Sequence, residues 1–279
     1  MSLNLKLSIA KDAGFCFGVK DAIAKAEESA QEFGKVYMLG DIVHNERVVH
    51  KLASKNVKVV ESLDDVKGAP VLFRSHGTKP EIWKQAQASG HTIIDATCPL
   101  VLEIHEEIKK LETDNRKLII IGDHGHDEVE GIKAQVENAI IVSSPKEARE
   151  LPRYKRAGII TQSTQAMENI QEIISILLPK IYDMKFINTV CFPTRRNQEQ
   201  IKELSANNDV MIIIGSYTSA NTKRLVSVSK MINERSYQVE NKEDIQSNWF
   251  NQHENVGITA GASSPQDLID EIVEKLKEL

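Results

Sequence analysis

Residues 93–105 read IIDATCPLVLEIH, and this stretch decides the fold. Its first residues are β-branched and apolar, as in a short buried strand. After Cys98, apolar residues recur every three or four positions, as on one face of a helix. The same order of strand, cysteine and helix recurs in AKDAGFCFGVKDA (10–22) and INTVCFPTRRNQE (187–199). These repeats, whose cysteines are 82 and 93 residues apart, predict three units of related design.

Short apolar segments alternate with amphipathic ones along the whole chain. The predicted strands are 35–39, 69–73, 91–95, 117–121, 138–142, 156–160, 185–189, 209–214, 237–240 and 255–259. The clearest predicted helices are 18–34, 99–114 and 196–207. Alternation of this kind is typical of parallel sheets covered by helices on both faces.

We therefore predict an α/β protein of three small domains with parallel sheets, arranged as a trefoil around a pseudo-threefold axis. The first domain spans 16–97, the second 98–190 and the third 191–279. The third is short of strands, and we expect a strand at 5–10, within the N-terminal segment 1–15, to complete it.

Composition excludes several classes of protein. The 279 residues carry a net charge of −5 and only 5% aromatic residues, which argues against a nucleic-acid partner. The first residues alternate in polarity rather than forming a signal peptide, and the longest apolar runs are too short to cross a bilayer. We expect a cytoplasmic protein with no membrane partner.

The three cysteines, Cys16, Cys98 and Cys191, are the candidate metal ligands. Each is predicted at a strand end and at the start of a helix, where the helix dipole favours thiolate. If the three domains face their strand ends inward, the thiolates meet and suit a [4Fe–4S] cluster with one open iron. Two alternatives stay open: buried cysteines acting as small hydrophobic residues, and structural zinc held by three Cys and one His.

Four histidines are predicted in strand-end turns: His44, His76, His124 and His126. Together with hydroxyl groups and helix N-termini they form a plausible cradle for a diphosphate. We expect three further histidines to be solvated or to cap helices: His50 and His105, on predicted helices, and His253, near a loop.

Glu128 is the candidate general acid. It lies two residues after His126 in a glycine-bounded turn, and a carboxyl group in a closed site can keep its proton near neutral pH. The alternative is a glutamate in the first turn of a helix, facing the dipole, and Glu130 competes for that description.

The motifs, taken in order, resemble those of the 4-hydroxy-3-methylbut-2-enyl diphosphate reductase family over essentially the whole chain. They are AGFCFGV (13–19), HN (44–45), SHG (75–77), DATCPLV (95–101), GHDEVEG (125–131), TQST (161–164), the turn at Cys191, GSYTSAN (215–221) and ITAGASSP (258–265).

The resemblance implies a trefoil around a [4Fe–4S] cluster and the reductive removal of an allylic hydroxyl with two electrons and two protons. The products would be isopentenyl diphosphate and dimethylallyl diphosphate. Cys16, Cys98 and Cys191 would ligate three irons, and the substrate hydroxyl would bind the fourth. A cluster that loses this unanchored iron would appear as [3Fe–4S].

Site roles follow from the same resemblance. Glu128 would be the proton donor, His126 would join the proton path, and Ser163 would orient the hydroxyl. The positions implied in substrate binding are His44, His76, His126, Ser163, Thr164, Ser219, Ala220, Asn221 and Ser263. The electron donor would be a ferredoxin or flavodoxin, with a docking patch expected near Lys223 and Arg224.

The chain departs from the family pattern at several positions. Ser163 replaces Thr and keeps the hydroxyl, whereas Ala220 replaces Ser and removes a diphosphate donor worth about 1.5–3 kcal/mol. The other departures are Asp127 for Pro, Glu103 for Lys and, after Cys191, an Arg that has either become Asn197 or moved by one position. They leave two alternatives open: a diverged paralogue acting on another substrate, and a non-enzymatic protein that senses redox state or metal.

Overall fold

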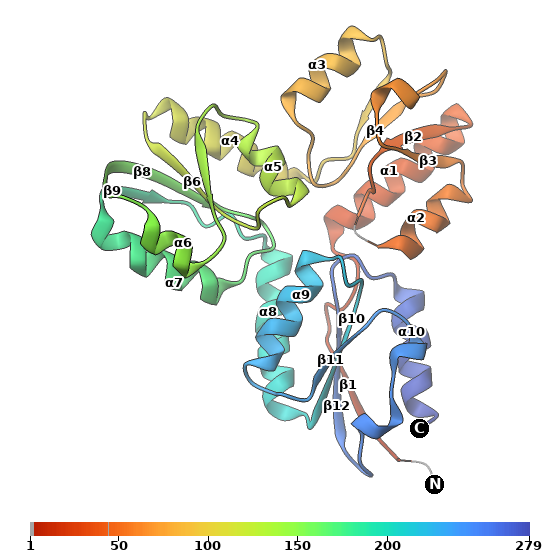
Figure 1. The fold of residues 1–279 in the computed structure, drawn as a ribbon. Helices are drawn as coiled ribbons and strands as arrows, with labels where there is room; N and C mark the ends of the chain where they lie inside the picture. Colours follow the sequence, from red (N-terminus) through yellow and green to blue (C-terminus); the bar gives the residue numbers. More distant parts are fainter. Residues whose placement is uncertain (1–2, 44) are drawn as a thin grey trace. The chain divides into compact units, whose positions relative to one another are not determined.

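The computed structural model describes residues 3–43 and 45–279. Its strands form three parallel sheets of four strands each (Figure 1). The chain divides into two compact units: unit 1 contains residues 3–19, 45–48 and 192–279, and unit 2 contains 20–43 and 49–191. In the described part of the chain, no helix combines the length and apolar character needed to span a membrane.

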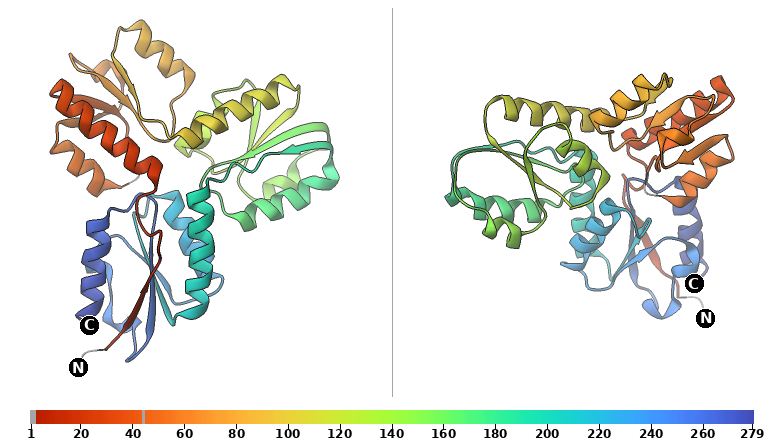
Figure 2. Two further views of the ribbon diagram at one scale, coloured as in Figure 1. Left: turned by 180° about the vertical axis from the view of Figure 1, so that it is seen from behind. Right: turned by 45° about the horizontal axis from the view of Figure 1, so that its top comes forward.

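Unit 1 contains one sheet, in the order β1-β12-β10-β11. Its strands are β1 (Lys6–Ile9), β10 (Val210–Ile214), β11 (Ser236–Val239) and β12 (Asn255–Ala260). Helices α8 (Phe192–Asn207) and α9 (Ala220–Lys230) cover one face and α10 (Gln266–Lys277) the other (Figure 2). Because β1 pairs with β12, with Lys6 opposite Asn255, the N-terminal strand completes the third sheet as predicted.

The first sheet of unit 2 has the order β3-β2-β4-β5. Its strands are β2 (Val36–Leu39), β3 (Val57–Val60), β4 (Val71–Phe73) and β5 (Ile93–Asp95). Helix α3 (Pro80–Ala88) packs on the face that carries Tyr37 and Phe73. Helices α1 (Phe17–Phe33) and α2 (Glu46–Ala53) lie on the opposite side of the sheet (Figure 1).

The second sheet of unit 2 has the order β7-β6-β8-β9. Its strands are β6 (Lys117–Ile121), β7 (Ala139–Val142), β8 (Tyr154–Thr161) and β9 (Ile181–Phe186). One face packs on α4 (Pro99–Thr113) and α5 (Asp127–Lys133), and the other on α6 (Pro145–Glu150) and α7 (Met167–Leu177). Among the described residues, the connections also contain short 3-10 helices, at Leu63–Asp65 and Leu178–Lys180 in unit 2 and at Lys242–Asp244 and Ser247–Trp249 in unit 1.

The three sheets share one topology. Written in the same direction, their orders are β1-β12-β10-β11, β5-β4-β2-β3 and β9-β8-β6-β7, and the edge strand named first always leads into a cysteine and a helix. This confirms the prediction of three related parallel α/β units. The domain boundaries and the threefold arrangement stay predictions.

Two strand predictions were inaccurate. β9 spans Ile181–Phe186 rather than 185–189, and β3 was not predicted. Both are edge strands. β9 mixes polar and exposed residues with apolar ones, which blurs its pattern, whereas β3 (VKVV) is mostly valine but only four residues long, and so short an apolar run does not specify a strand. Helix α8 begins at Phe192 rather than at 196, because Pro193 is tolerated in the first turn of a helix.

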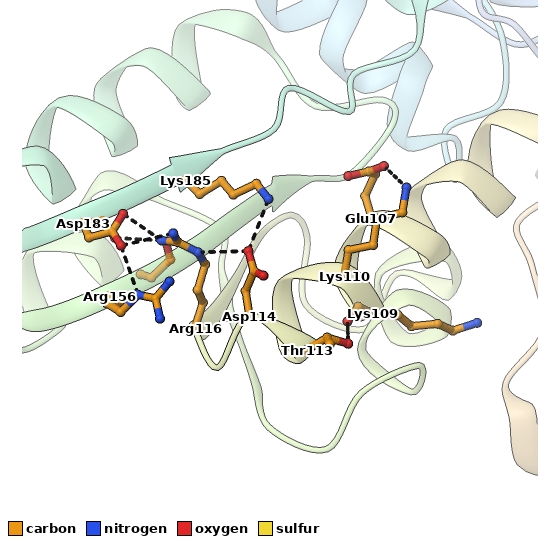
Figure 3. A network of polar contacts seen from close by, with 10 residues as sticks. Glu107, Lys109, Lys110, Thr113, Asp114, Arg116, Arg156, Asp183 and Lys185 are labelled. Atoms are coloured by element: carbon orange, nitrogen blue, oxygen red, sulfur yellow. Dashed lines mark hydrogen bonds and ion pairs between the residues drawn. The ribbon is translucent and has the colours of Figure 1, made fainter.

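Ion pairs reinforce edge strand β9 (Figure 3), whose Ile181 and Met184 also pack in the core beneath α7. The guanidinium of Arg116, largely buried, donates from Nη1 and Nη2 to the two carboxylate oxygens of Asp183 at 3.0 and 3.1 Å. Arg156 donates to the same carboxylate at 3.0 Å. These hydrogen bonds, with Arg116 first, lower the pKa of Asp183. Inward and outward charges on an edge strand also discourage pairing with another chain.

The sheet of β6–β9 allows a direct test of the packing. Ile159 on β8 is fully buried, whereas Tyr182 on β9 is 90% exposed. Ile159→Ala leaves a cavity, and we expect it to reduce the free energy of unfolding by about 2–5 kcal/mol. Tyr182→Ala, the matched control, should change it by less than about 0.5 kcal/mol. Guanidinium denaturation followed by circular dichroism measures both, and equal effects would contradict the packing described.

Candidate active site

The three cysteines share one main-chain environment. The N–H of Cys98 donates to the carbonyl of Ser75 at 3.0 Å, that of Cys191 to Ser163 at 3.0 Å and that of Cys16 to Ala262 at 3.2 Å. Each acceptor lies two residues beyond the end of a central strand, β4, β8 or β12. The cysteine and the neighbouring strand-end turn are therefore fixed together in the same way three times.

Each cysteine immediately precedes a helix, α1, α4 or α8, and each is partly exposed. A helix N-terminus stabilises a thiolate, the form that binds metals. No disulfide joins the cysteines. Cys16 belongs to unit 1 and the other two to unit 2, and within residues 3–43 and 45–279 no three His, Cys, Asp or Glu side chains are grouped around a metal position.

Glu128 is a buried carboxyl group with two hydrogen bonds from one residue. It lies in the first turn of α5 and is 2% exposed. The Ser163 N–H donates to Oε1 at 2.6 Å, and the Ser163 hydroxyl donates to Oε2 at 2.7 Å. Glu128 is therefore a first-turn residue, as the alternative predicted, but its side chain is buried rather than exposed to solvent; its role as a general acid stays a prediction.

The surroundings of Glu128 change its acidity. Burial raises the pKa of the carboxyl above its usual value, and the negative charge of Asp123 raises it further. The two hydrogen bonds from Ser163 oppose this effect because they favour the ionised form. Burial dominates, so the group keeps its proton to higher pH than an exposed glutamate.

Two predicted histidines lie beside this acid. His126 caps α5, and its Nδ1 accepts a hydrogen bond from the N–H of Glu128 at 3.2 Å. A ring nitrogen that accepts is unprotonated, which leaves Nε2 to carry the proton of the neutral ring. The ring of His76 meets that of His126 edge to face, with centroids 5.9 Å apart. Unit 2 therefore brings together His76, His126, Glu128 and Ser163.

Buried Gln162 organises the turn that contains Ser163. Its Nε2 donates to the hydroxyl of Thr164 at 2.9 Å, and its Oε1 accepts from the N–H of Asp123 at 2.9 Å. The turn after β8 is thereby tied to the turn after β6. Nearby, Asp127 pairs with Arg74 at 2.8 Å, so this departure from the family pattern adds an ion pair between α5 and the turn after β4.

Unit 1 contains three of the predicted substrate-binding residues, Ser219, Asn221 and Ser263. Ser219 caps α9, its hydroxyl accepting from the N–H of Thr222 at 3.3 Å. Among the described residues, neither amide atom of Asn221 nor the hydroxyl of Ser263 has a hydrogen-bond partner, although both side chains are buried. Unpaired buried polar groups of this kind are costly and fit a polar ligand. Ala220 begins α9 and supplies no side-chain donor.

Residues 45–48 belong to unit 1 although the flanking chain belongs to unit 2. Asn45 donates from Nδ2 to the carbonyl of Ser263 at 2.8 Å. Arg47 binds both carboxylate oxygens of Glu271 and one of Asp267 on α10, the last at 3.2 Å. His44, predicted to bind diphosphate, lies outside the described residues, but the adjacent Asn45 is fixed beside Ser263.

Two histidine expectations were wrong. His105 is buried rather than solvated, and burial lowers its pKa to about 4. It packs where Gly77 has no side chain: a Cβ there would lie 2.8 Å from the imidazole. His124, expected in the cradle, is instead exposed and pairs with Glu147 at 2.9 Å. The helical periodicity of α4, which places His105 on the face with Ile104 and Ile108, could have revealed the first.

Comparison with known proteins identifies the family. The model of the family described as "LytB protein" matches residues 7–277. The chain belongs to the LytB family. Among curated relatives, proteins named 4-hydroxy-3-methylbut-2-enyl diphosphate reductase from Geobacter metallireducens and Aquifex aeolicus are each 38% identical to it. The first match covers 99% of this chain and 98% of the Geobacter protein. The second covers 97% of this chain and 96% of the Aquifex protein.

Solved structures of the LytB type agree with the fold. One is the structure of (E)-4-hydroxy-3-methyl-but-2-enyl diphosphate reductase, described as the terminal enzyme of the non-mevalonate pathway. It is 37% identical to this chain and has a TM-score of 0.72, and the match covers 99% of this chain and 100% of that one. The Plasmodium falciparum reductase is 29% identical, with coverage of 97% and 87% and a TM-score of 0.91.

The raised pKa of Glu128 predicts a pH effect on stability. The folded protein binds this proton more tightly than the unfolded chain, so burying the group costs stability as pH rises from the ordinary value of 4.5 through the folded pKa. Glu128→Gln removes the titration, and we expect the melting temperature of the variant to rise relative to wild type between pH 4.5 and 8.

Calorimetry of the metal-free protein measures this difference. Glu130→Gln, on the same helix and only half-buried, is the matched control. A wild-type to Glu128→Gln difference that stays constant across the range would show that Glu128 does not hold its proton in the folded state.

Proposed function

We propose that this protein is a 4-hydroxy-3-methylbut-2-enyl diphosphate reductase. The observation that supports this most directly is the buried, hydrogen-bonded Glu128 beside His126 and His76, in a LytB-family chain related to named reductases over nearly its full length. The reaction replaces an allylic hydroxyl by hydrogen, takes up two electrons and two protons, and releases water. The products are isopentenyl diphosphate and dimethylallyl diphosphate.

Glu128 is the proton donor in this proposal. Hydroxide is a poor leaving group, so the hydroxyl must be protonated as its C–O bond breaks. A carboxyl group whose pKa is raised by burial keeps its proton to higher pH than an exposed glutamate, as a general acid requires. Ser163, bound to both oxygens of Glu128 through its N–H and hydroxyl, orients the acid and presents its own hydroxyl to the substrate, with Thr164 adjacent.

The substrate diphosphate is assigned to buried polar groups of unit 1, among them the residue before α9, and to histidines of unit 2. In unit 1 these are Asn221 and Ser263, with Ser219 at the start of α9. In unit 2 His76 and His126 are the candidates, and His44 joins them from outside the described residues. A diphosphate held away from the reacting carbon positions the hydroxyl for reaction.

Cys16, Cys98 and Cys191 would hold an iron–sulfur cluster, [4Fe–4S] when complete and [3Fe–4S] after loss of the iron without a protein ligand. Three thiols in identical strand-end, helix-start positions are a donor set suited to such a cluster. When bound, the cluster supplies electrons and Lewis acidity that side chains lack. We further propose a ferredoxin or flavodoxin as the electron donor and the cytoplasm as the location.

The proposal predicts a specific loss in Glu128→Gln. After anaerobic reconstitution with iron and sulfide and reduction of a viologen dye, wild type should oxidise the dye when 4-hydroxy-3-methylbut-2-enyl diphosphate is added. We expect the variant to keep its iron content but to lose about 10²–10⁴-fold in turnover, the usual contribution of a general acid. Glu130→Gln, on the same helix, should turn over like wild type.

The outcomes separate the alternatives. Undiminished turnover in Glu128→Gln would remove this residue from the mechanism. A brown wild-type protein that ignores the substrate would favour a diverged paralogue, with Ala220 and Asn197 as the first positions to revert. Zinc in place of iron would favour a structural metal site.

The ligand assignment has its own test. Cys98→Ser removes one thiol and should leave less than half of the wild-type iron after reconstitution, because two protein ligands hold a cluster poorly. Iron and sulfide analysis with electron paramagnetic resonance measures this. Ser75→Ala, which keeps the carbonyl bound to the Cys98 N–H, is the control. Wild-type iron content in Cys98→Ser would exclude this cysteine as a ligand.

A further inference from the structure

Two of the three cysteines are followed directly by phenylalanine, and these two rings stack on each other. Phe17 follows Cys16 and Phe192 follows Cys191. Their centroids are 5.5 Å apart and their planes differ by 7°. Both residues belong to unit 1. The third cysteine, Cys98, is instead followed by Pro99, whose ring fixes the first turn of α4 without a partner.

Core packing does not account for this pair. Phe192 is 48% exposed and Phe17 is only partly buried. An aromatic side chain that stays this exposed gains only part of the free energy that complete burial would provide. Stacked aromatic rings nevertheless attract each other beyond the area they bury, so the pair can join two chain segments at the surface.

The segments that the pair joins are the first residues of α1 and α8. Cys191 is held on its N-terminal side, because its N–H donates to the Ser163 carbonyl in unit 2. On its C-terminal side, one peptide bond away, Phe192 stacks on Phe17 in unit 1. Cys16 is held in the same manner, by the Ala262 carbonyl through its N–H and by Phe17 one bond further on.

We infer that Phe17 and Phe192 are positioning residues: by joining the first residues of α1 and α8, they support the cysteine that precedes each helix, Cys16 or Cys191, as a ligand of the proposed iron–sulfur cluster. The inference rests on the proposed function, since it assigns both cysteines to one cluster. The rings act through the adjacent cysteines and touch no reacting atom. Their chemistry requires an aromatic face at both positions, and neither charge nor hydrogen bonding.

The first test measures how firmly the reconstituted protein keeps its cluster. Under anaerobic conditions with a chelator, Phe192→Ala should lose its visible absorbance about two- to tenfold faster than wild type, as expected if the energy of one aromatic pair opposes ligand release. Phe192→Tyr, which keeps the stack, should decay at the wild-type rate. Phe33→Ala is the matched control, because Phe33 is a similarly exposed phenylalanine at the other end of α1.

The second test needs no cluster. In a Cys98→Ser background the chain has only Cys16 and Cys191 as thiols. A short bis-maleimide should link them within the metal-free molecule, and Phe192→Ala should lower the yield while Phe192→Tyr restores it. Unchanged melting temperatures would show that the variants fold.

The two proposals fail separately. If wild type takes up no iron–sulfur cluster, the proposed function fails, and the cross-linking still reports on the stack. If wild type holds a cluster but Phe192→Ala decays and cross-links like wild type, or no faster than Phe33→Ala, the positioning role is overturned.

Discussion

The hydrogen bond from each cysteine N–H to a strand-end carbonyl is the constraint on which the candidate site depends. It occurs at Ser75, Ser163 and Ala262, always two residues past a central strand. His76 directly follows the first of these turn residues and Ser263 the third. Ser163 itself uses its carbonyl for Cys191 and its N–H and hydroxyl for Glu128. A displacement of any of these cysteines would therefore also move the neighbouring polar side chain.

The buried polar groups of both units lower the stability of the folded protein. The cores around them are complete, with strands such as β6 and β10 buried on both faces. Against this background, a buried carboxyl in unit 2 and unpaired amide and hydroxyl groups in unit 1 are exceptions. Groups of this kind destabilise a protein unless a ligand or a reaction uses them, which is why they indicate a site.

Much of the fold could be predicted from the sequence, because the patterns that indicate strands, cysteines and helices are local. The strand–cysteine–helix repeat identifies the three related sheets, and the shortage of strands after Cys191 identifies the role of the N-terminal strand. Edge strand β3 was missed because it is only four residues long, and β9 was displaced because polar and exposed residues interrupt its apolar pattern. The attachment of 45–48 to unit 1 could not be predicted, because it depends on a contact between distant segments: Asn45 binds a carbonyl 218 residues away. The burial of His105 follows instead from the apolar face of α4.

The candidate site residues divide in the same way. Glu128, His126 and Ser163 could be singled out from their motifs, and the structure brings them together. Their hydrogen-bond geometry, the support from Gln162 and the exclusion of His124 required coordinates, because a turn sequence does not specify where each side chain points.

The pairing of β1 with β12 has a consequence for biosynthesis. The ribosome makes Lys6–Ile9 first among the strands, but its partner Asn255–Ala260 emerges last. The sheet of unit 1 is therefore completed only near the end of translation, whereas both sheets of unit 2 are formed from segments already released. Cys16, which follows β1, also reaches its folded position late. Its N–H donates to the carbonyl of Ala262, and Ala262 is among the last residues to be synthesised. If the three cysteines hold the proposed cluster, Cys16 would reach its folded position only near the end of synthesis, and the cluster would be completed after translation.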